Sequence, residues 1–135
     1  MGDVTENILT RVFVETGHIY VTNQGYVAIH CYVNDIVVAD FLQRQIHGRV
    51  RPHLRVYDVI VSKRGDLEYA ARHLLGCPLS EQRKQELSLV LQFATTKDSK
   101  DRHGIATRLA ELLAYHRIER RIKRASVSST AVSET

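Results

Sequence analysis

The chain has 135 residues, of which 44% are hydrophobic and 25% charged, and its formal net charge is +4. These proportions are typical of one compact soluble domain with its own core, and no apolar run reaches the roughly eighteen residues that a membrane span needs. Because the N-terminus lacks a charged-then-apolar signal pattern, we expect an intracellular protein, cytoplasmic or organellar, and not a secreted one.

Neither the cysteines nor the histidines form a recognisable metal-binding or catalytic motif. The two cysteines, Cys31 and Cys77, lack the spacing of metal ligands. Five histidines are likewise scattered without zinc-site spacing: His47, His53, His73, His103 and His116. We therefore interpret both cysteines as buried free thiols of a protein in a reducing compartment.

The positive charge is concentrated toward the C-terminus. Residues 97–124 contain nine of the 19 basic residues and four of the 15 acidic ones, so the rest of the chain is nearly neutral. This asymmetry favours an anionic partner, nucleic acid before a membrane, although a solvated basic helix without a partner is the alternative. The candidate contacts to a nucleic-acid backbone are Arg120, Arg121, Lys123 and Arg124.

The first third of the chain predicts a helix followed by a β-hairpin. Residues 3–16 carry apolar side chains at helical spacing, and we expect Gly17 to take the left-handed conformation that ends a helix. Residues 18–22 and 26–33 alternate in polarity as strands do, and the Asn-Gln-Gly sequence between them is typical of a tight turn.

Alternation in this hairpin predicts two faces of different character. The branched apolar residues fall on one face, toward the core, whereas histidines, tyrosines and hydroxyl groups share the other. The candidate nucleic-acid contacts on that second face and its turn are His18, Tyr20, Thr22, Gln24, Tyr26, His30 and Tyr32. The alternative is an exposed strand face with ordinary β-propensity.

A second helix and a second, shorter hairpin follow. Residues 36–47 predict a helix closed by Gly48, residues 49–51 a short strand broken by a proline, and residues 54–62 the clearest strand of the chain. Three arginines lie close together in this region and are candidate phosphate contacts: Arg49, Arg51 and Arg55.

The last part of the chain predicts helices. Helical patterns occur at residues 64–75 and after Ser80, which we expect to cap its helix. A polar loop at 95–104 is expected next, and then a helix over 105–123 with Ile118 among its inward residues. The serine- and threonine-rich residues 125–135 predict a disordered tail, so the compact domain is expected to span residues 1–124.

This order of elements predicts an α+β fold in which an antiparallel sheet carries helices on one face only. Because the hairpin faces differ in polarity, the second face of the sheet is left to solvent or to a ligand. A two-layer structure with such a face fits the major groove of DNA.

Four stretches, in this order and spacing, resemble the LAGLIDADG homing endonuclease family. The resemblance extends over about residues 8–124. Residues 9–17 lie where the family has its nine-residue motif, 35–48 match its second helix, 55–62 its strand before the third helix, and 74–93 its basic, glutamine-bearing fourth helix.

The resemblance implies the order helix–hairpin–helix–hairpin–helices, with a saddle-shaped antiparallel sheet that binds long DNA sites in the major groove. Single-motif members pair as homodimers through their first helices, and the acidic residue at the motif's eighth position binds divalent metal. The implied activity is therefore nuclease (hydrolase) activity with Mg²⁺, which activates water. Arg83 and Lys84 lie where family members carry basic residues near the scissile phosphate.

The motif itself departs from the family pattern. Its eighth position is Thr16, whose neutral hydroxyl is a poor Mg²⁺ ligand, and the neighbouring Glu15 lies about a hundred degrees around the helix. Thr10 and Arg11 replace the small residues through which two such helices approach each other. We therefore expect a degenerate active site in which Glu15 is a weak candidate catalytic residue and metal ligand.

The leading hypothesis is sequence-specific binding of double-stranded DNA, with metal-dependent cleavage weakened or lost. The protein is then a homodimer, or a heterodimer with a partner that supplies an acid. The alternative is an RNA-binding splicing cofactor or a component of a nucleoprotein assembly without nuclease activity, whose basic helix binds the backbone without reading sequence. A third hypothesis is a plain structural domain.

Overall fold

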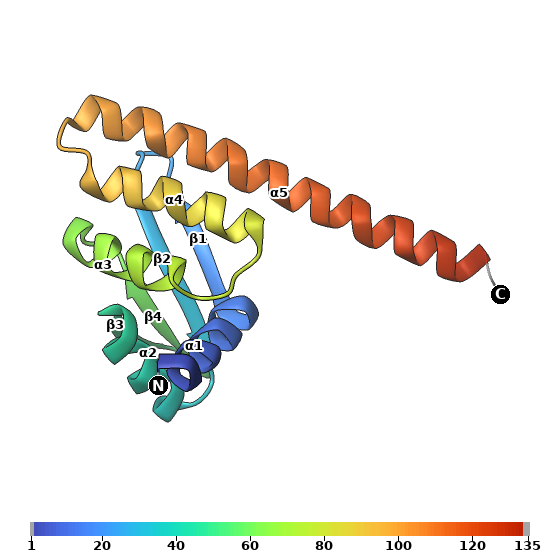
Figure 1. Cartoon of the computed structure of the whole chain (residues 1–135), viewed down its shortest axis with the longest axis horizontal. Helices are drawn as coiled ribbons and strands as arrows, with labels where there is room; N and C mark the ends of the chain where they lie inside the picture. Colours follow the sequence, from blue (N-terminus) through green and yellow to red (C-terminus); the bar gives the residue numbers. More distant parts are fainter. Residues whose placement is uncertain (1, 134–135) are drawn as a thin grey trace.

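The structure is a computed structural model that describes residues 2–133, and it has the predicted α+β fold (Figure 1). The elements in chain order are α1 (Gly2–Thr16), β1 (Gly17–Val21), β2 (Val27–Val33), α2 (Ile36–Ile46), β3 (Arg49–His53), β4 (Val56–Val61), α3 (Arg64–Leu75), α4 (Glu81–Thr95) and α5 (Ser99–Ser133). Among the described residues, no helix combines the length and the apolar character that crossing a membrane requires.

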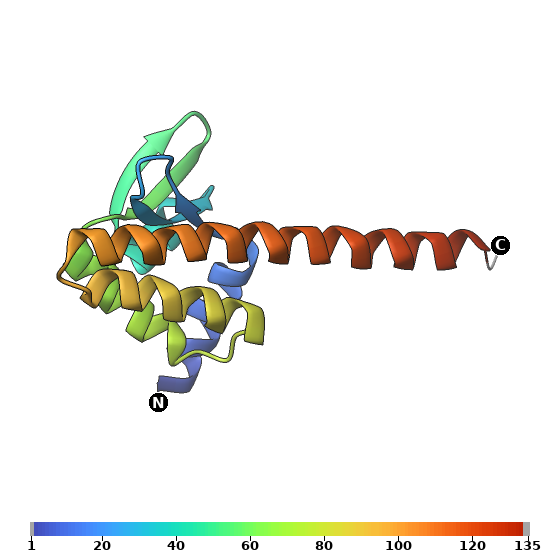
Figure 2. The same ribbon diagram turned by 90° about the horizontal axis from the view of Figure 1, so that it is seen from above.

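The four strands form one antiparallel sheet in the order β1-β2-β4-β3. Figure 2 shows the strands on one side of the molecule and α1, α3 and α4 on the other. Side chains alternate along β2, so that Ile29 and Cys31 are fully buried against the helical layer while Ala28, His30 and Tyr32 are partly exposed. One face of the sheet is therefore covered by helices, as predicted.

Gly17 does not end α1 in a left-handed conformation, as the sequence suggested, but begins β1. A Cβ at this position would lie 2.4 Å from Cδ1 of Phe13 and 2.6 Å from its carbonyl oxygen, so only glycine lets the strand pass so close to the helix. The predicted role of Gly48 also changes. His47 takes the left-handed conformation (φ 59°) that ends α2, and Gly48 instead lets β3 approach Val59.

The second hairpin differs from the prediction at its turn. β3 continues through Pro52 to His53, because a proline is tolerated on an edge strand. Leu54, predicted to begin the next strand, lies instead in the turn with a φ of 58° and is 94% exposed. The first strand of this hairpin is thus longer than the sequence predicts, and the second strand begins later.

Helix α5 is longer than predicted at both ends. It begins at Ser99, within the predicted loop, because the Asp98 carboxylate accepts hydrogen bonds from the amides of Lys100 and Asp101 at 2.9 and 3.0 Å. It continues to Ser133 through the predicted disordered tail, since no glycine or proline follows Gly104 to interrupt it. Residues 134–135 of that tail lie outside the described residues.

The C-terminal half of α5 extends away from the rest of the molecule (Figures 1 and 2). Ile118, predicted to face inward, is 56% exposed there. The N-terminal half is anchored, because Leu109 is fully buried and packs with the core. At the point where the helix leaves the body, Nδ1 of His116 lies 2.6 Å from a carboxylate oxygen of Glu86 in α4, and both side chains are buried.

We expect the Glu86→Ala substitution to lower the free energy of unfolding by about 3–5 kcal/mol, because it leaves the buried partners of this carboxylate unpaired. Urea unfolding at neutral pH measures the change. The exposed Glu111→Ala substitution in α5 is the matched control, expected to change stability by less than about 0.5 kcal/mol. A loss for Glu86→Ala no larger than that of the control would contradict the structural role of the pair.

Candidate nucleic-acid interface

The sheet face that points away from the helices carries cross-strand rows of polar and aromatic side chains. In one row His18 pairs with His30, His30 with Ile60, and Ile60 with Arg49, so the row crosses all four strands. In the next row Tyr32 pairs with Asp58 and Asp58 with Arg51. We call this surface the open face; its members are His18, Tyr20, Ala28, His30, Tyr32, Arg49, Arg51, Asp58 and Ile60.

Four rings of the open face form one continuous cluster. The ring of Tyr20 meets that of His30 edge-on at 4.9 Å between centroids, and His30 lies 5.9 Å from Tyr32 with nearly parallel rings. His18 joins the cluster at 6.0 Å from Tyr20 and 5.9 Å from Tyr32. The structure therefore brings together four residues that the sequence analysis placed on one face. Mutual packing restricts their side-chain rotamers before any ligand arrives.

Two of these rings are uncharged at neutral pH. Partial burial, together with the nearby Arg83 guanidinium and His30, lowers the pKa of His18 below its ordinary value. Burial and then contact with the Tyr20 hydroxyl raise the pKa of Tyr32 to about 12. Both side chains therefore present neutral hydrogen-bonding groups, which suit the donors and acceptors on base edges better than they suit phosphates.

Asp58 is a member of the open face that the sequence analysis missed. Its carboxylate is buried, and its oxygens lie 3.0 and 3.1 Å from Nδ1 of His30 and 3.5 Å from a guanidinium nitrogen of Arg51. A signal for it was present, because Asp58 is the sole charged residue of an otherwise apolar and aromatic strand. Such a residue needs a partner on a neighbouring strand.

The remaining predicted contacts surround the open face. Thr22, Gln24 and Tyr26 are exposed at the β1–β2 turn, where Thr22 Oγ1 accepts a hydrogen bond from the Tyr26 amide at 3.1 Å. Arg49 is exposed on β3, and Arg55 is exposed in the β3–β4 turn. The three predicted arginines thus lie at one edge of the sheet, and one of them, Arg51, is paired with Asp58.

The two basic residues that the family resemblance assigns near the scissile phosphate lie at the start of α4. The Arg83 guanidinium donates to Glu86 at 3.2 Å and to the carbonyl oxygen of Gly17 at 3.0 Å, and it lies over the Phe13 ring. Its side chain is 17% exposed. Lys84 is partly buried one residue further along. Arg83 is therefore already engaged in holding α1, β1 and α4 together.

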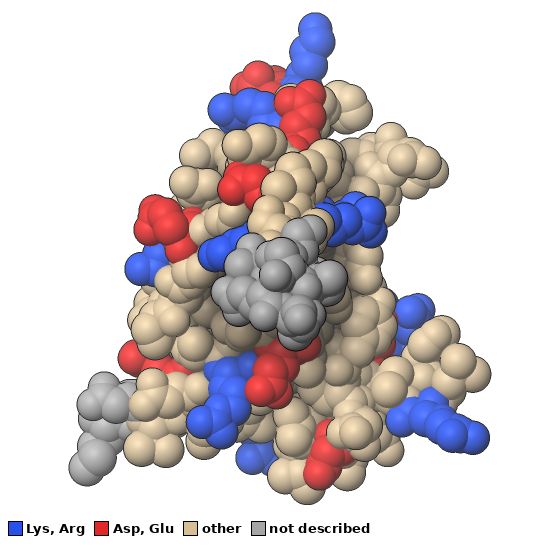
Figure 3. All heavy atoms as spheres, turned by 90° about the vertical axis from the view of Figure 1, so that its right-hand side faces the viewer, with Lys and Arg blue, Asp and Glu red and all other residues tan. Residues whose placement is uncertain are grey.

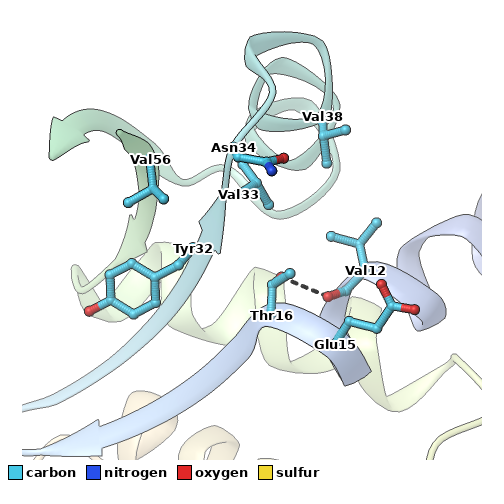
Figure 4. Close-up of a pocket in the computed structure, with 8 residues that line it drawn as sticks. All are labelled: Val12, Glu15, Thr16, Tyr32, Val33, Asn34, Val38 and Val56. Atoms are coloured by element: carbon cyan, nitrogen blue, oxygen red, sulfur yellow. Dashed lines mark hydrogen bonds between the residues drawn. The ribbon is translucent and has the colours of Figure 1, made fainter. Parts of the chain in front are cut away.

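The end of α1 borders an open pocket of about 380 Å³ between α1, β2 and α2 (Figure 4). Thr16 lies in this pocket, and its hydroxyl donates to the carbonyl oxygen of Val12 at 2.7 Å. Glu15 is exposed at the pocket's edge, and Asn34 contributes an amide. The pocket is otherwise lined mainly by valines.

These residues do not fit a Mg²⁺ site within one chain. Mg²⁺ requires carboxylate or similar oxygen ligands in octahedral arrangement, whereas the polar side chains of the pocket are one carboxylate, the committed Thr16 hydroxyl, one amide and the Tyr32 phenol. Among the described residues, no group of three or more histidine, cysteine, aspartate or glutamate side chains is placed to hold a metal ion.

The predicted basic contacts of α5 lie on the part of the helix that projects from the body (Figure 1). Arg121, Lys123 and Arg124 are exposed, and Arg120 is partly exposed. Figure 3 views the molecule from the side toward which α5 extends, and there basic and acidic side chains are interspersed. Where this view is coloured, single basic side chains alternate with acidic ones.

Comparison with known proteins identifies the fold. No family model and no curated protein matches the chain. The homing endonuclease I-CvuI, in a complex with uncleaved DNA and 2 mM Mg, superposes with a TM-score of 0.62 at 16% identity over 82% of each chain. The homing endonuclease I-TnaI superposes with a TM-score of 0.59 at 18% identity, over 82% of this chain and 96% of its own. The LAGLIDADG meganuclease I-AabMI, bound to uncleaved DNA, superposes with a TM-score of 0.55 at 14% identity. The match covers 66% of this chain and 35% of that protein.

At these identities the similarity shows the fold alone. The four-stranded antiparallel sheet with five helices matches that of LAGLIDADG homing endonucleases, which confirms the fold class implied by the sequence resemblance.

Proposed function

We propose that this chain, which has the fold of the LAGLIDADG homing endonucleases, binds double-stranded DNA sequence-specifically with its open face in the major groove. The observation that carries the proposal is the cluster of His18, Tyr20, His30 and Tyr32 on an uncovered sheet. Structural neighbours of the same fold include proteins held in complexes with DNA.

The chemistry of the open face supports reading of base edges. The major groove is about 12 Å wide and admits a two-stranded β-ribbon, and each base pair there displays a distinct order of donors, acceptors and methyl groups. Neutral imidazole and phenol groups match these donors and acceptors. The turn residue Gln24 is a further candidate, because an amide pairs with an adenine edge in two hydrogen bonds.

The arginines at the border of the open face are suited to phosphate contacts, which fix the position of a protein on the duplex without reading its sequence. Arg49 and Arg55 are exposed and, in the described residues, have no acidic partner within ion-pair distance. The basic end of α5 supplies further contacts in this proposal, through Arg120, Arg121, Lys123 and Arg124.

Cleavage is weakened or lost in this proposal. Thr16 takes the place of the motif's acid, and its hydroxyl donates a hydrogen bond to the carbonyl oxygen of Val12. Glu15 is left as an isolated carboxylate. If cleavage survives, Mg²⁺ is the expected cofactor and Glu15 the expected ligand, with a second chain supplying further oxygens. Lys84 then remains a candidate phosphate contact, and Arg83 reaches the phosphate only by giving up its present partners.

The protein is proposed to act as a homodimer, or as a heterodimer whose partner supplies the missing acid. Helix α1 exposes apolar side chains, since Val4 is 67% and Ile8 46% exposed. However, Arg11 is exposed on the same helix, and the Thr10 hydroxyl donates to the Glu6 carbonyl at 2.6 Å. An acidic partner helix would compensate the arginine, which favours the heterodimer where such a partner exists.

The alternative function is RNA binding, as a splicing cofactor or as part of a nucleoprotein assembly. It is favoured by the basic, projecting end of α5, which can contact a backbone independently of the sheet. A competition assay separates the two functions, because preference for structured RNA over duplex DNA of equal length would support the alternative.

We expect the double substitution Arg49→Gln with Arg55→Gln to weaken duplex binding and to reduce the salt dependence of affinity. Each lost phosphate contact lowers the slope of log K against log salt by about 0.9. The control is Arg44→Gln with Arg72→Gln, an equal charge change on exposed positions of α2 and α3. Fluorescence anisotropy at several salt concentrations measures both. Equal slopes in the two variants, or a flat response in the unaltered chain, would contradict the proposal.

We expect the unaltered chain to leave its selected duplex intact in Mg²⁺ under conditions in which it binds. Replacing Thr16 by Asp restores a carboxylate at the motif's eighth position and is expected to raise cleavage. Thr10→Asp, which adds a carboxylate earlier in the same helix, is the control. A gel assay of end-labelled duplex measures the products, and rapid Mg²⁺-dependent cutting by the unaltered chain would refute the loss of catalysis.

A further inference from the structure

Asp58 lies in the middle of the open face, yet its side chain is only 2% exposed. Removing a carboxylate from water is costly unless opposite charges or hydrogen-bond donors satisfy it. A negative charge near the centre of a DNA-binding surface also repels phosphates. An acid at this position therefore calls for a role that an apolar residue on the same strand cannot perform.

The contacts of Asp58 fix the proton arrangement of His30. A carboxylate can only accept hydrogen bonds, so the 3.0 and 3.1 Å contacts require that Nδ1 of His30 carries a proton and donates it. The guanidinium of Arg51, 3.5 Å from the second oxygen, gives the carboxylate a positive partner. In the Nδ1-protonated tautomer of the imidazole, Nε2 is a hydrogen-bond acceptor.

The Nε2 atom of His30 is available to a ligand. In the described part of the chain, every buried side-chain nitrogen or oxygen of a residue that is not exposed has a hydrogen-bond partner. His30 is such a residue, with a side chain 19% exposed, and both of its hydrogen bonds within the described residues use Nδ1. Nε2 must therefore reach solvent on the open face. The rings of Tyr20 and Tyr32 hold the imidazole in place on its other sides.

We propose that Asp58 is a positioning residue that presents His30 Nε2 as a fixed acceptor, and that His30 thereby selects an amino-bearing base at one position of the DNA site. In the major groove the exocyclic amino groups of adenine and cytosine are donors, whereas guanine and thymine present acceptors at the equivalent edge. His30 accordingly favours adenine or cytosine on the strand that it contacts. This inference rests on the proposed function, and it deepens it by naming the group that the central histidine reads.

The test is selection of duplexes from a random pool by the unaltered chain, Asp58→Asn, His30→Asn and Asp40→Asn. In Asp58→Asn the new amide can offer either its carbonyl or its amino group to the imidazole, so the ring is no longer fixed in one tautomer. In His30→Asn the new side chain places an amide nitrogen near the former Nδ1 position and can still donate to Asp58, but it lacks Nε2. Asp40 is exposed in α2, so its substitution repeats the charge change away from the open face.

The expected result for the unaltered chain is a preference for adenine or cytosine at one position of about five- to tenfold, the lower range for a single mismatched pair. Asp58→Asn and His30→Asn lose this preference at the same position and keep the profile elsewhere, whereas Asp40→Asn keeps it. A thermal melt identifies a variant that fails to fold. If Asp58→Asn does not fold, His30→Asn decides the test alone.

Two results would overturn the inference while leaving DNA binding intact. One is an unchanged profile in either open-face variant, and the other is an even weakening at all positions, which a merely structural role of Asp58 would produce. Absence of any enrichment by the unaltered chain is a different result, because it would refute the proposed function and this inference with it.

Discussion

Glu86 is a fully buried carboxylate on α4 that ties together elements distant in the sequence. It accepts hydrogen bonds from His116 of α5 at 2.6 Å and from Arg83 of its own helix at 3.2 Å. Arg83 in turn donates to the carbonyl oxygen of Gly17, where α1 ends and β1 begins. A buried carboxylate is tolerated only when its partners are in place. The positions of α5, α4 and the junction between α1 and β1 are therefore set together.

The same contacts bear on catalysis. Gly17 directly follows Thr16, so the end of the motif helix is held by an arginine that the family resemblance would place at a phosphate. Phe13 packs against both Gly17 and the Arg83 guanidinium, which makes this junction rigid. Thr16 stands where the family resemblance expects an acid, and the Arg83 guanidinium is committed to contacts within the fold. Both features support the weakened cleavage of the proposed function.

The sequence predicts elements well where a local pattern determines them. Alternation placed His30 and Tyr32 on one face correctly, because the period of two is a property of any strand. The predicted extent of α5 is wrong at both ends. The polar composition there indicates loop and tail, whereas the Asp98 cap and the absence of a glycine or proline after Gly104 favour helix. A polar composition indicates only that a segment faces solvent, whereas capping residues and helix breakers decide where a helix begins and ends.

Long-range partners were beyond the reach of the sequence pattern. Asp58 and His30 are 28 residues apart, and Glu86 and His116 are 30 apart, so no local periodicity connects them. The sequence predicts that Gly17 and Gly48 end helices, whereas the structure requires glycine there for close packing against Phe13 and Val59. Such packing can be known only once the layers are assembled. The site's outline was therefore predictable, and its internal charge balance was not.

The central claim is that the open face, and not the helical side of the body, meets the bases of the duplex. Histidines report on both sides of the molecule, with His18 and His30 on the open face and His47 and His73 in contact with Tyr69 on the helical side. Imidazole NMR signals can be followed while a selected duplex is added. The account predicts that the signals of His18 and His30 shift or broaden while those of His47 and His73 stay in place. Perturbation of His47 and His73 with unchanged signals from His18 and His30 would contradict it.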